Sequence, residues 1–222
     1  MSDLSIIHAM VIGDGYVRKD GCICMKHSVV QKDYAEYKAH ILKGFGFRVK
    51  TSVLPRNPKS YSTNDNFLVI TNTTKFGKEL RKKFYPNNKK VVPVEVFDDF
   101  GSQEWAILFQ DDGRTNKISH YNTVIDGGRR RVECDPFVNR YEFCFPMFSD
   151  EEINAAISSL DKLGILARIG WHRKLGQRLI WISKAVGKIR FYETMRSLIV
   201  PSMKYKIIIR PTLGYKKVKQ GD

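Results

Sequence analysis

The sequence predicts an α+β protein of two similar halves, each with its elements in the order αββαββα. Two observations carry this prediction. An apolar run that ends in an acidic residue and glycine occurs twice, at residues 7–15 and 105–113, half a chain apart. After each run come two strand patterns, an amphipathic helix, two more strand patterns and a last helix. The expected division is residues 1–86, a linker at 87–101, and residues 102–222.

Start and stop signals place the elements of the first half. Asp3 can cap the first helix, Gly44 and Gly46 end the second, and Pro86 follows the third. The helices are expected at Leu4–Gly13, Val30–Leu42 and Thr74–Phe84. The strands are expected at Tyr16–Lys19, Cys22–His27, Arg48–Leu54 and Phe67–Thr71, with an Asp20-Gly21 turn and a polar loop at Pro55–Asn66.

The second half repeats this order. Ser102 is expected to cap its first helix, and residues 149–152 form a capping box for the next. Pro201 follows the last helix. The helices are expected at residues 102–111, 150–163 and 185–199. The strands are expected in a long basic region at Arg114–Phe148 with a turn at 126–128, and at Ile165–His172 and Arg178–Ser183, which are joined through Gly176. Trp105 and Trp181 are interpreted as core residues.

Composition and charge narrow the class of partner. The chain has 222 residues, of which 42% are hydrophobic, so it can bury a core and is not expected to be disordered. The net charge is +15, with 17 basic and 10 acidic side chains in residues 1–100, and 21 and 13 in residues 101–222. A positive charge spread over a whole folded protein favours a long polyanion as the partner, most simply a nucleic acid.

The sequence gives no sign of export or of a membrane span. Residues 1–3 lack a basic start, and no run of about 18 apolar residues occurs. The four cysteines form no C-x-x-C pair and the five histidines have no ligand spacing, so we expect reduced thiols and no zinc site. The predicted location is intracellular, in the cytoplasm of a bacterium or phage-infected cell, or in an organelle.

The acidic end of each apolar run points to a chemical role. Asp14 and Asp112 each stand at the C-terminal end of a predicted helix, where the helix dipole disfavours an anion. Apolar neighbours disfavour the charge further. Two such carboxylates require a compensating positive charge, and a divalent cation is the usual one in proteins.

The two runs resemble the LAGLIDADG motif of the homing endonucleases. Residues 86–93 and 199–206 each carry two lysines and are similar to the basic segments of the monomeric, intron-encoded branch of that family. The chain therefore resembles a single-chain member with two motifs over nearly its whole length. Ala9 and Gly13 fit the small third and seventh positions of the motif, whereas their counterparts Ile107 and Asp111 do not. We therefore expect an asymmetric or slightly wider pair of motif helices.

The resemblance implies a fold and a metal site. The motif helices would pack at the centre on a pseudo-two-fold axis, beside antiparallel saddle-shaped sheets that bind DNA. Asp14 and Asp112 would be catalytic acids that bind Mg²⁺, with the backbone carbonyls of Gly13 and Asp111 as further ligands. Mn²⁺ would substitute for Mg²⁺, and Ca²⁺ would support binding without efficient cleavage.

The basic residues singled out by the resemblance fall into two groups. Lys90 and Lys206 would be catalytic, because they could hold or acidify the attacking water or stabilise charge on the phosphate. The others would line the strands that enter the major groove, and the strand register decides which of them face DNA. These candidates are Arg18, Lys26, Arg48, Lys50, Arg56, Arg114, Lys117, Arg129, Arg130, Arg131, Arg168, Arg173, Lys174 and Arg178.

The function implied by the resemblance is that of a monomeric, site-specific homing endonuclease. Such an enzyme would hydrolyse both strands of a long duplex DNA target and leave short 3′ overhangs. One alternative is an RNA-binding maturase on the same fold, whose partner is its own intron RNA. The other is a DNA-binding regulator that does not cut. The presence of both Asp14 and Asp112 favours the nuclease, although it does not exclude a second activity.

Overall fold

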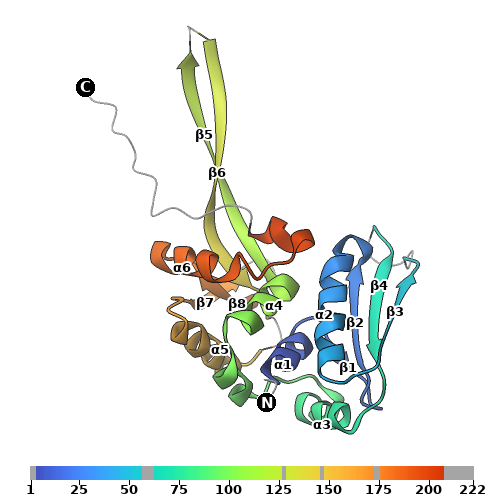
Figure 1. Ribbon diagram of the computed structural model, residues 1–222. Helices are drawn as coiled ribbons and strands as arrows, with labels where there is room; N and C mark the ends of the chain where they lie inside the picture. Colours follow the sequence, from blue (N-terminus) through green and yellow to red (C-terminus); the bar gives the residue numbers. More distant parts are fainter. Residues whose placement is uncertain (1–3, 57–62, 127–128, 146–147, 173–175, 208–222) are drawn as a thin grey trace.

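The protein consists of two α/β halves on either side of a central pair of helices (Figure 1). The computed structural model describes residues 4–56, 63–126, 129–145, 148–172 and 176–207, and for residues 118–137 it describes the backbone alone. Asp3, expected as a helix cap, lies outside the described residues. No helix within these ranges is long and apolar enough to cross a membrane.

Both halves have the predicted order of elements, which confirms the α+β fold. In the first half these are α1 (Ser5–Ile12), β1 (Tyr16–Val17), β2 (Ile23–Ser28), α2 (Lys32–Gly44), β3 (Val49–Leu54), β4 (Asn66–Thr71) and α3 (Lys75–Phe84). In the second half they are α4 (Ser102–Asp112), β5 (Gly113–Asp126), β6 (Arg129–Phe143), α5 (Asp150–Lys162), β7 (Arg168–His172), β8 (Gln177–Ile182) and α6 (Ala185–Met195).

The two sheets have the same topology. Each is a four-stranded antiparallel sheet, with the strand orders β1-β2-β4-β3 and β5-β6-β8-β7. In the first sheet, residues of β2 and β4 alternate between buried and partly exposed, so one face packs on the core and the other is free. The equivalent order of strands in the two sheets supports the internal repeat predicted from the sequence.

Several predicted element ends were wrong. Strand β1 ends at Val17 instead of Lys19, and the long strand region ends at Phe143 instead of Phe148. Gly101, not Ser102, precedes α4, and its N–H donates to the Glu104 carboxylate at 2.9 Å. The first strand of the β7–β8 pair begins at Arg168 instead of Ile165. Helix α6 ends at Met195 and not at residue 199, because the chain turns there and the Val200 N–H donates to the side chain of Gln110 on α4. The capping box at the start of α5 is confirmed.

Residues 87–101, expected as a linker, are packed into the core. The segment contains two short 3₁₀ turns, Pro86–Asn88 and Val94–Asp99. Val96 and Phe97 are buried, and the Phe97 ring stacks on that of Trp105 with centroids 5.9 Å apart. The connection between the halves therefore contributes to the same hydrophobic core that α4 enters.

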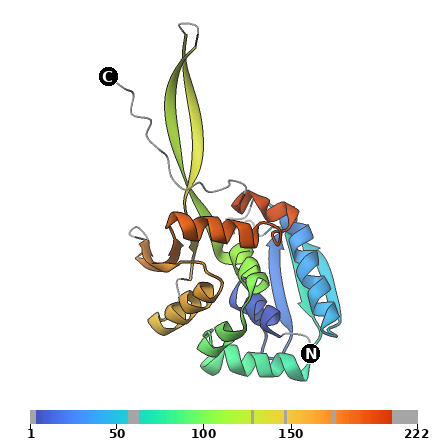
Figure 2. The ribbon, with the colours of Figure 1, turned by 60° about the vertical axis from the view of Figure 1, so that its left-hand side comes forward.

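Helices α1 and α4 pack against each other between the two sheets (Figures 1 and 2). Seven of the eight residues of α1 are buried, as expected for a helix that is apolar on all sides. At the N-terminal ends, the Ser5 hydroxyl donates to Glu104 across the helix pair at 2.8 Å. At the C-terminal ends, Gly13 leaves room for the carboxylate of Asp111. The close approach of the two helices brings their C-terminal ends to one place.

The largest difference between the halves is the β5–β6 hairpin. Strand β1 has 2 residues, whereas β5 and β6 have 14 and 15. Strand β6 pairs with β8 only at residues 141–143, so most of the hairpin extends beyond the second sheet as a separate two-stranded ribbon (Figure 1). The pairing shifts register between Asn116 and Lys117. A long basic strand region was predicted here, but not that it would leave the sheet.

Replacement of Gly13 by alanine tests the importance of this close approach. A Cβ atom at Gly13 would lie 2.1 Å from Oδ2 of Asp111, so we expect Gly13→Ala to lower the free energy of unfolding by about 2 kcal/mol or more. The control is Gly44→Ala at the end of α2, where an added Cβ meets nothing within 4 Å. The control should be neutral or slightly stabilising. Equal denaturant midpoints for the two variants would contradict the close approach.

Candidate active site at the ends of two helices

Two predicted catalytic acids lie at the junction of the central helices. Asp14 follows the C-cap of α1 at Gly13, and Asp112 is the last residue of α4. Burial, together with the charges of Asp14 and Asp111, raises the pKa of Asp112 to about 7. Burial and the charge of Asp111 raise the pKa of Asp14 to about 6, although 42% of its side chain is exposed. The junction therefore holds acidic groups that resist ionisation.

Two lysines cap the helix ends that carry these acids. The ammonium group of Lys90 donates to three carbonyl oxygens at the end of α1, those of Ile12, Gly13 and Gly15, at 3.0, 3.0 and 3.3 Å. Lys206 does the same at the end of α4, where it donates to Phe109, Gln110 and Asp111 at 3.3, 2.6 and 3.0 Å. These contacts satisfy carbonyls that a helix end leaves without partners and place positive charge at the negative end of each dipole.

The lysines also act electrostatically across the junction. Burial lowers the pKa of both, and nearby acids oppose this effect. The largest opposing charge for Lys90 is that of Asp112, which belongs to the other half of the chain. For Lys206 the largest opposing charges are those of Asp111 and then Asp14. Each lysine therefore caps one of the two helices, and its charge also interacts with an acid of the other half.

Asp111 forms a buried ion pair with Lys38 of α2. The Lys38 ammonium lies 2.6 and 2.8 Å from the two carboxylate oxygens, and neither side chain is exposed. The Tyr34 hydroxyl donates to Oδ1 at 2.8 Å, and the backbone N–H of Asp14 donates to Oδ2 at 3.1 Å. Burial alone would raise the pKa of Asp111, but Lys38 and these donors hold it below its ordinary value. Asp111 is therefore an anion fixed by the protein itself.

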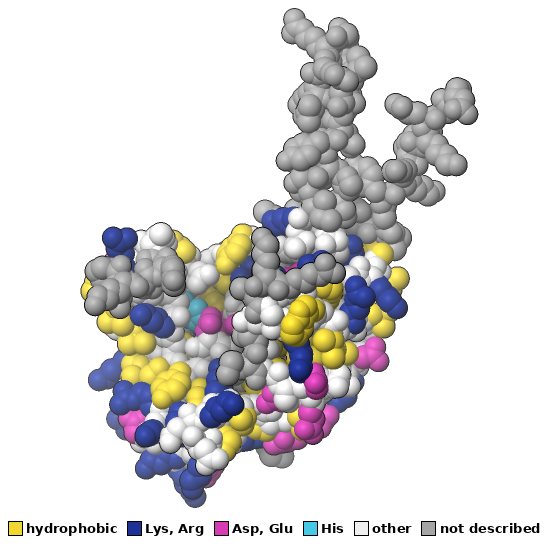
Figure 3. All heavy atoms as spheres, turned by 180° about the vertical axis from the view of Figure 1, so that it is seen from behind, with side chains coloured by type: hydrophobic (Ala, Val, Ile, Leu, Met, Phe, Trp, Pro, Cys, Tyr) yellow, Lys and Arg dark blue, Asp and Glu magenta, His cyan; other side chains and the backbone are white. Residues whose placement is uncertain are grey.

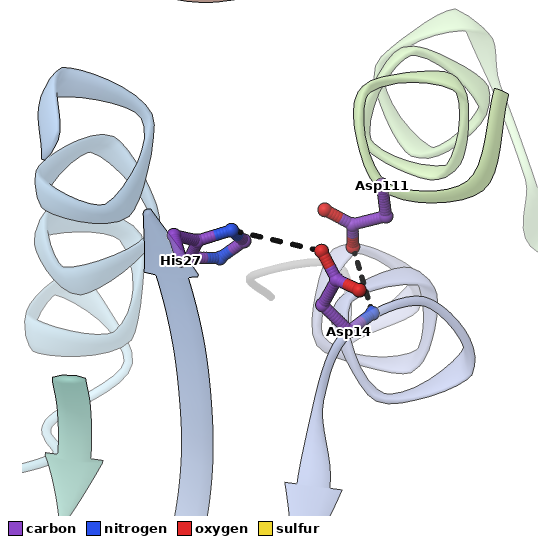
Figure 4. Close-up of side chains that lie close together, drawn as sticks. All are labelled: Asp14, His27 and Asp111. Carbon is purple, nitrogen blue, oxygen red and sulfur yellow. Dashed lines mark hydrogen bonds and ion pairs between the residues drawn. The ribbon is translucent and has the colours of Figure 1, made fainter. Parts of the chain in front are cut away.

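His27 at the end of β2 completes this cluster (Figure 4). Its Nδ1 lies 3.6 Å from Oδ2 of Asp14, and its Nε2 lies 3.4 Å from the Lys38 ammonium. Burial and the adjacent positive charge of Lys38 lower the pKa of His27 to about 4, so the ring is neutral at physiological pH. The ring packs edge-on against Tyr34, with centroids 5.2 Å apart.

Sequence reasoning missed His27, Tyr34 and Lys38. A signal for Lys38 was present, because it lies on the buried stripe of α2 with Ala35, Ala39 and Leu42. A lysine on an apolar stripe requires an anion close by. The sequence also showed the anion, because Asp111 stands at the seventh motif position, where a small residue is expected. Neither residue alone identifies the other, because they lie 73 residues apart in the chain.

The predicted DNA contacts of the first half lie on or beside the free face of the first sheet. Lys26 and Lys50 are exposed, and the register places them opposite Leu68 and Ile70, which point away from the core. Arg48 and Arg56 are exposed at the two ends of β3. Arg18 is exposed in the β1–β2 turn. It forms an ion pair with Asp20 at 2.9 Å.

The predicted contacts of the second half are only partly described. Arg114, Lys117 and Arg168 are exposed on β5 and β7, whereas Arg178 pairs with Asp150 at the start of α5. The side chains of Arg129, Arg130 and Arg131 lie outside the described part of β6, and Arg173 and Lys174 lie wholly outside the described residues. The register of the remaining candidates joins Arg114, Glu142, Trp181 and Arg168 in one row across all four strands.

Ion pairs at this row offset part of the positive charge of the second basic face. The Glu142 carboxylate is buried between Arg114 and Arg140 and forms ion pairs with both. The Arg140 guanidinium lies over the ring of Trp181, 4.2 Å from its centroid. Trp181 was expected in the core, but it is only half-buried. It lies in the same row as Glu142, on the face of the sheet opposite to the buried ring of Tyr141. The expectation for Trp105 is confirmed.

The acids and the basic side chains share one face of the molecule. Figure 3 shows acidic and histidine side chains together in a hollow, with Lys and Arg side chains on both sides of it. Next to Asp112 the structure has a cavity of about 240 Å³, lined also by Lys90 and by apolar side chains such as Phe145 and Phe148. Such a face offers positive charge to a long anion and acidic groups at its centre.

Comparisons with known proteins agree with this geometry. Residues 4–188 match the model of the LAGLIDADG DNA endonuclease family. The structure is similar to that of the homing endonuclease I-WcaI bound to its DNA recognition sequence, with a TM-score of 0.70, 18% identity, and 93% of this chain and 85% of that chain covered. It is also similar to I-DmoI in complex with DNA and Ca, with a TM-score of 0.51, 11% identity, and coverage of 90% and 94%. A comparison with curated proteins finds no match.

The raised pKa values predict that the two acids destabilise the metal-free protein at high pH. A carboxyl whose pKa is higher in the folded state binds more protons there than in the unfolded chain, so stability falls as pH rises from about 4 to 7. Asp112→Asn and Asp14→Asn remove this cost. In EDTA at pH 8, Asp112→Asn should raise the melting temperature by roughly 3–8 °C, and Asp14→Asn should raise it less because its side chain is 42% exposed to solvent. Both gains should vanish near pH 4.

The matched control is Glu79→Gln on the exposed surface of α3, which should leave the melting temperature unchanged at both pH values. Scanning calorimetry of the four proteins over this pH range makes the comparison. A gain for the aspartate variants that is equal at pH 4 and pH 8 would show that their charges are not the cause.

Proposed function

Because this chain belongs to the LAGLIDADG DNA endonuclease family, we propose that it hydrolyses both strands of a long, specific duplex target with the help of divalent cations and leaves short 3′ overhangs. The observation that carries the proposal is the junction of α1 and α4, where Asp14 and Asp112 lie close enough to interact, beside the half-buried Lys90 and Lys206. One acid from each half is the arrangement expected when each acid serves mainly one DNA strand.

The donor set at the junction fits a divalent cation. Asp14 and Asp112 offer carboxylate oxygens, which Mg²⁺ and Mn²⁺ prefer, and their raised pKa values reflect a shortage of positive charge that a cation would supply. The carbonyls of Gly13 and Asp111 are further candidate ligands, and each already accepts a hydrogen bond from a lysine. A bound cation would polarise the scissile phosphate and lower the pKa of an attacking water. The relative I-DmoI has been solved with DNA and Ca, and with DNA and Mn.

Lys90 and Lys206 have a structural role and an electrostatic role in the proposed reaction. Lys90 and Lys206 hold the ends of the two motif helices, and thereby the acids that follow or end them. Their positive charges also lie close enough to Asp112 and Asp14 to stabilise negative charge that builds up on a phosphate there. No side chain of the site needs to form a covalent bond to DNA.

The basic faces supply binding. Exposed Lys and Arg side chains lie on both sheets, on either side of the junction, and most of them would contact phosphates instead of bases. The relative I-WcaI has been solved bound to its DNA recognition sequence, which supports duplex DNA as the ligand of these faces. Since one chain already contains both motifs and both sheets, the proposed active form is a monomer.

Loss of either acid should abolish double-strand cleavage without loss of the fold. Asp14→Asn and Asp112→Asn each remove a charged ligand, so we expect the rate of linear-product formation to fall about 100-fold or more. Binding to the same duplex in Ca²⁺ should change little, because the sheets carry most contacts. The measurement is plasmid cleavage with and without Mg²⁺, over a randomised target library. Wild-type cleavage in EDTA, or a fully active single variant, would refute the proposal.

Loss of either lysine should slow chemistry more than binding. We expect Lys90→Ala and Lys206→Ala to lower the single-turnover rate at saturating enzyme at least 10-fold and to leave the affinity in Ca²⁺ nearly unchanged. The control is Lys50→Ala on the free face of β3, which should weaken binding and spare the single-turnover rate. If the lysine variants lose affinity alone, their role is only that of surface charge.

A further inference from the structure

His27, Asp14 and Asp111 have the composition of a metal-binding triad. One donor atom from each lies within 4.8 Å of the other two, and Figure 4 shows them converging from β2 and from the ends of α1 and α4. A histidine and two carboxylates at such distances are a common ligand set for a transition metal. The hydrogen bonds around the triad decide whether a cation could use it.

The carboxylate of Asp111 has no free position for a cation. An ionised carboxylate offers about four acceptor positions. Here four donors fill them, namely two contacts from Lys38, the Tyr34 hydroxyl and the backbone N–H of Asp14. Lys38 contacts two members of the triad, Asp111 and His27, and both side chains of the Lys38–Asp111 ion pair are wholly buried. A metal ion would have to displace this lysine.

Lys38 also determines which ring nitrogen of His27 carries the proton. A lysine ammonium has three donors and no acceptor. Two of its donors serve Asp111, and the third faces Nε2 of His27 at 3.4 Å, so Nε2 must be the acceptor of the neutral ring. The ring proton is then on Nδ1, the atom that faces Oδ2 of Asp14 at 3.6 Å. His27 therefore presents a donor, and not a metal-binding lone pair, to the catalytic acid.

Among the side chains that the structure describes, none supports the second acid as Asp111 and His27 support Asp14. Gly13 stands in the first motif where Asp111 stands in the second, so it offers no carboxylate to the end of α4. Asp112 instead faces a cavity lined by Lys90 and by apolar side chains. The backbone N–H of Asp14 is thus bound by Asp111, and its carboxylate lies 3.6 Å from His27, whereas Asp112 ends its own helix and lines a cavity together with Lys90.

We propose that His27, Lys38 and Asp111 form a positioning relay that serves Asp14 alone and makes the two strand-cleaving steps unequal. Asp111 holds the backbone of Asp14, Lys38 holds Asp111 and sets the tautomer of His27, and the Nδ1–H of His27 aims the Asp14 carboxylate. The relay rests on the proposed nuclease function, because it assigns Asp14 to one strand. The relay adds that cleavage of the DNA strand served by Asp14 depends on His27, whereas cleavage of the other strand does not.

The test is single-turnover cleavage of a duplex with a different label on each strand. The strand served by Asp14 is first identified as the one whose cleavage Asp14→Asn slows more. His27→Phe keeps the ring packing and removes the donor, so it should slow that strand at least 10-fold, leave the other within about twofold, and cause nicked DNA to accumulate. His27→Asn keeps an N–H donor near the position of Nδ1 and should restore much of the lost rate.

A double variant tests the role of Lys38 without leaving Asp111 as an unpaired buried charge. Lys38→Met combined with Asp111→Asn removes both charges of the ion pair, and it should reproduce the strand bias of His27→Phe. Titration of the DNA-free protein with Mn²⁺ separates the relay from a metal triad. The relay predicts the same number of bound ions in wild type and His27→Phe, whereas loss of one ion would show that His27 is a ligand and overturn the proposal.

The outcomes distinguish the relay from the nuclease function beneath it. If wild-type protein cuts both strands and His27→Phe slows both equally or neither, the relay is wrong and the nuclease stands. If wild-type protein does not cut any duplex of the library in Mg²⁺ or Mn²⁺, the proposed function itself fails. Melting temperatures of all variants show whether a slow rate comes from loss of the fold, which would slow both strands together.

Discussion

The structure depends on bringing the negative ends of two buried helices to one point. Each end carries the partial negative charge of its dipole, and Asp14, Asp111 and Asp112 add carboxylates there. Three lysines offset this accumulation: Lys90 and Lys206 bind the helix carbonyls, and Lys38 binds Asp111. Helix α2, the packed connection between the halves and the turn after α6 carry these lysines to the junction.

The stability and the chemistry of the site oppose each other. Asp111 is fully compensated and its pKa is held low, whereas the pKa values of Asp14 and Asp112 are raised towards neutrality. The protein therefore places the buried positive charge of Lys38 beside Asp111. The negative charges of Asp14 and Asp112 are left only partly compensated. A site that tolerates this cost in the free protein gains affinity for a cation when one arrives. The same arrangement explains why Gly13 cannot carry a side chain: the compensated acid occupies its place.

The parts predicted from the sequence are those that local pattern determines. Continuous apolar runs located the central helices, Ser149 marked a helix start by its capping chemistry, and the repeated acid–glycine ends located Asp14 and Asp112. The parts missed depend on distant partners. Lys38 and Asp111 each break a local rule, and only the fold shows that each accounts for the other. Helix α6 was drawn too long because its apolar spacing continues after the backbone turns towards Gln110.

The Lys38–Asp111 contact joins the two halves, since α2 belongs to the first and α4 to the second. This has a consequence for the ancestry of such a chain. Were the first half to pair with a copy of itself, two buried lysines would meet two glycines and no carboxylate. A self-paired second half would press two aspartates together with no cation. The ion pair thus contributes pairing specificity. It favours the association of the two different halves and disfavours a symmetrical homodimer of either half, so the sequences of the two halves can diverge without a return to homodimers.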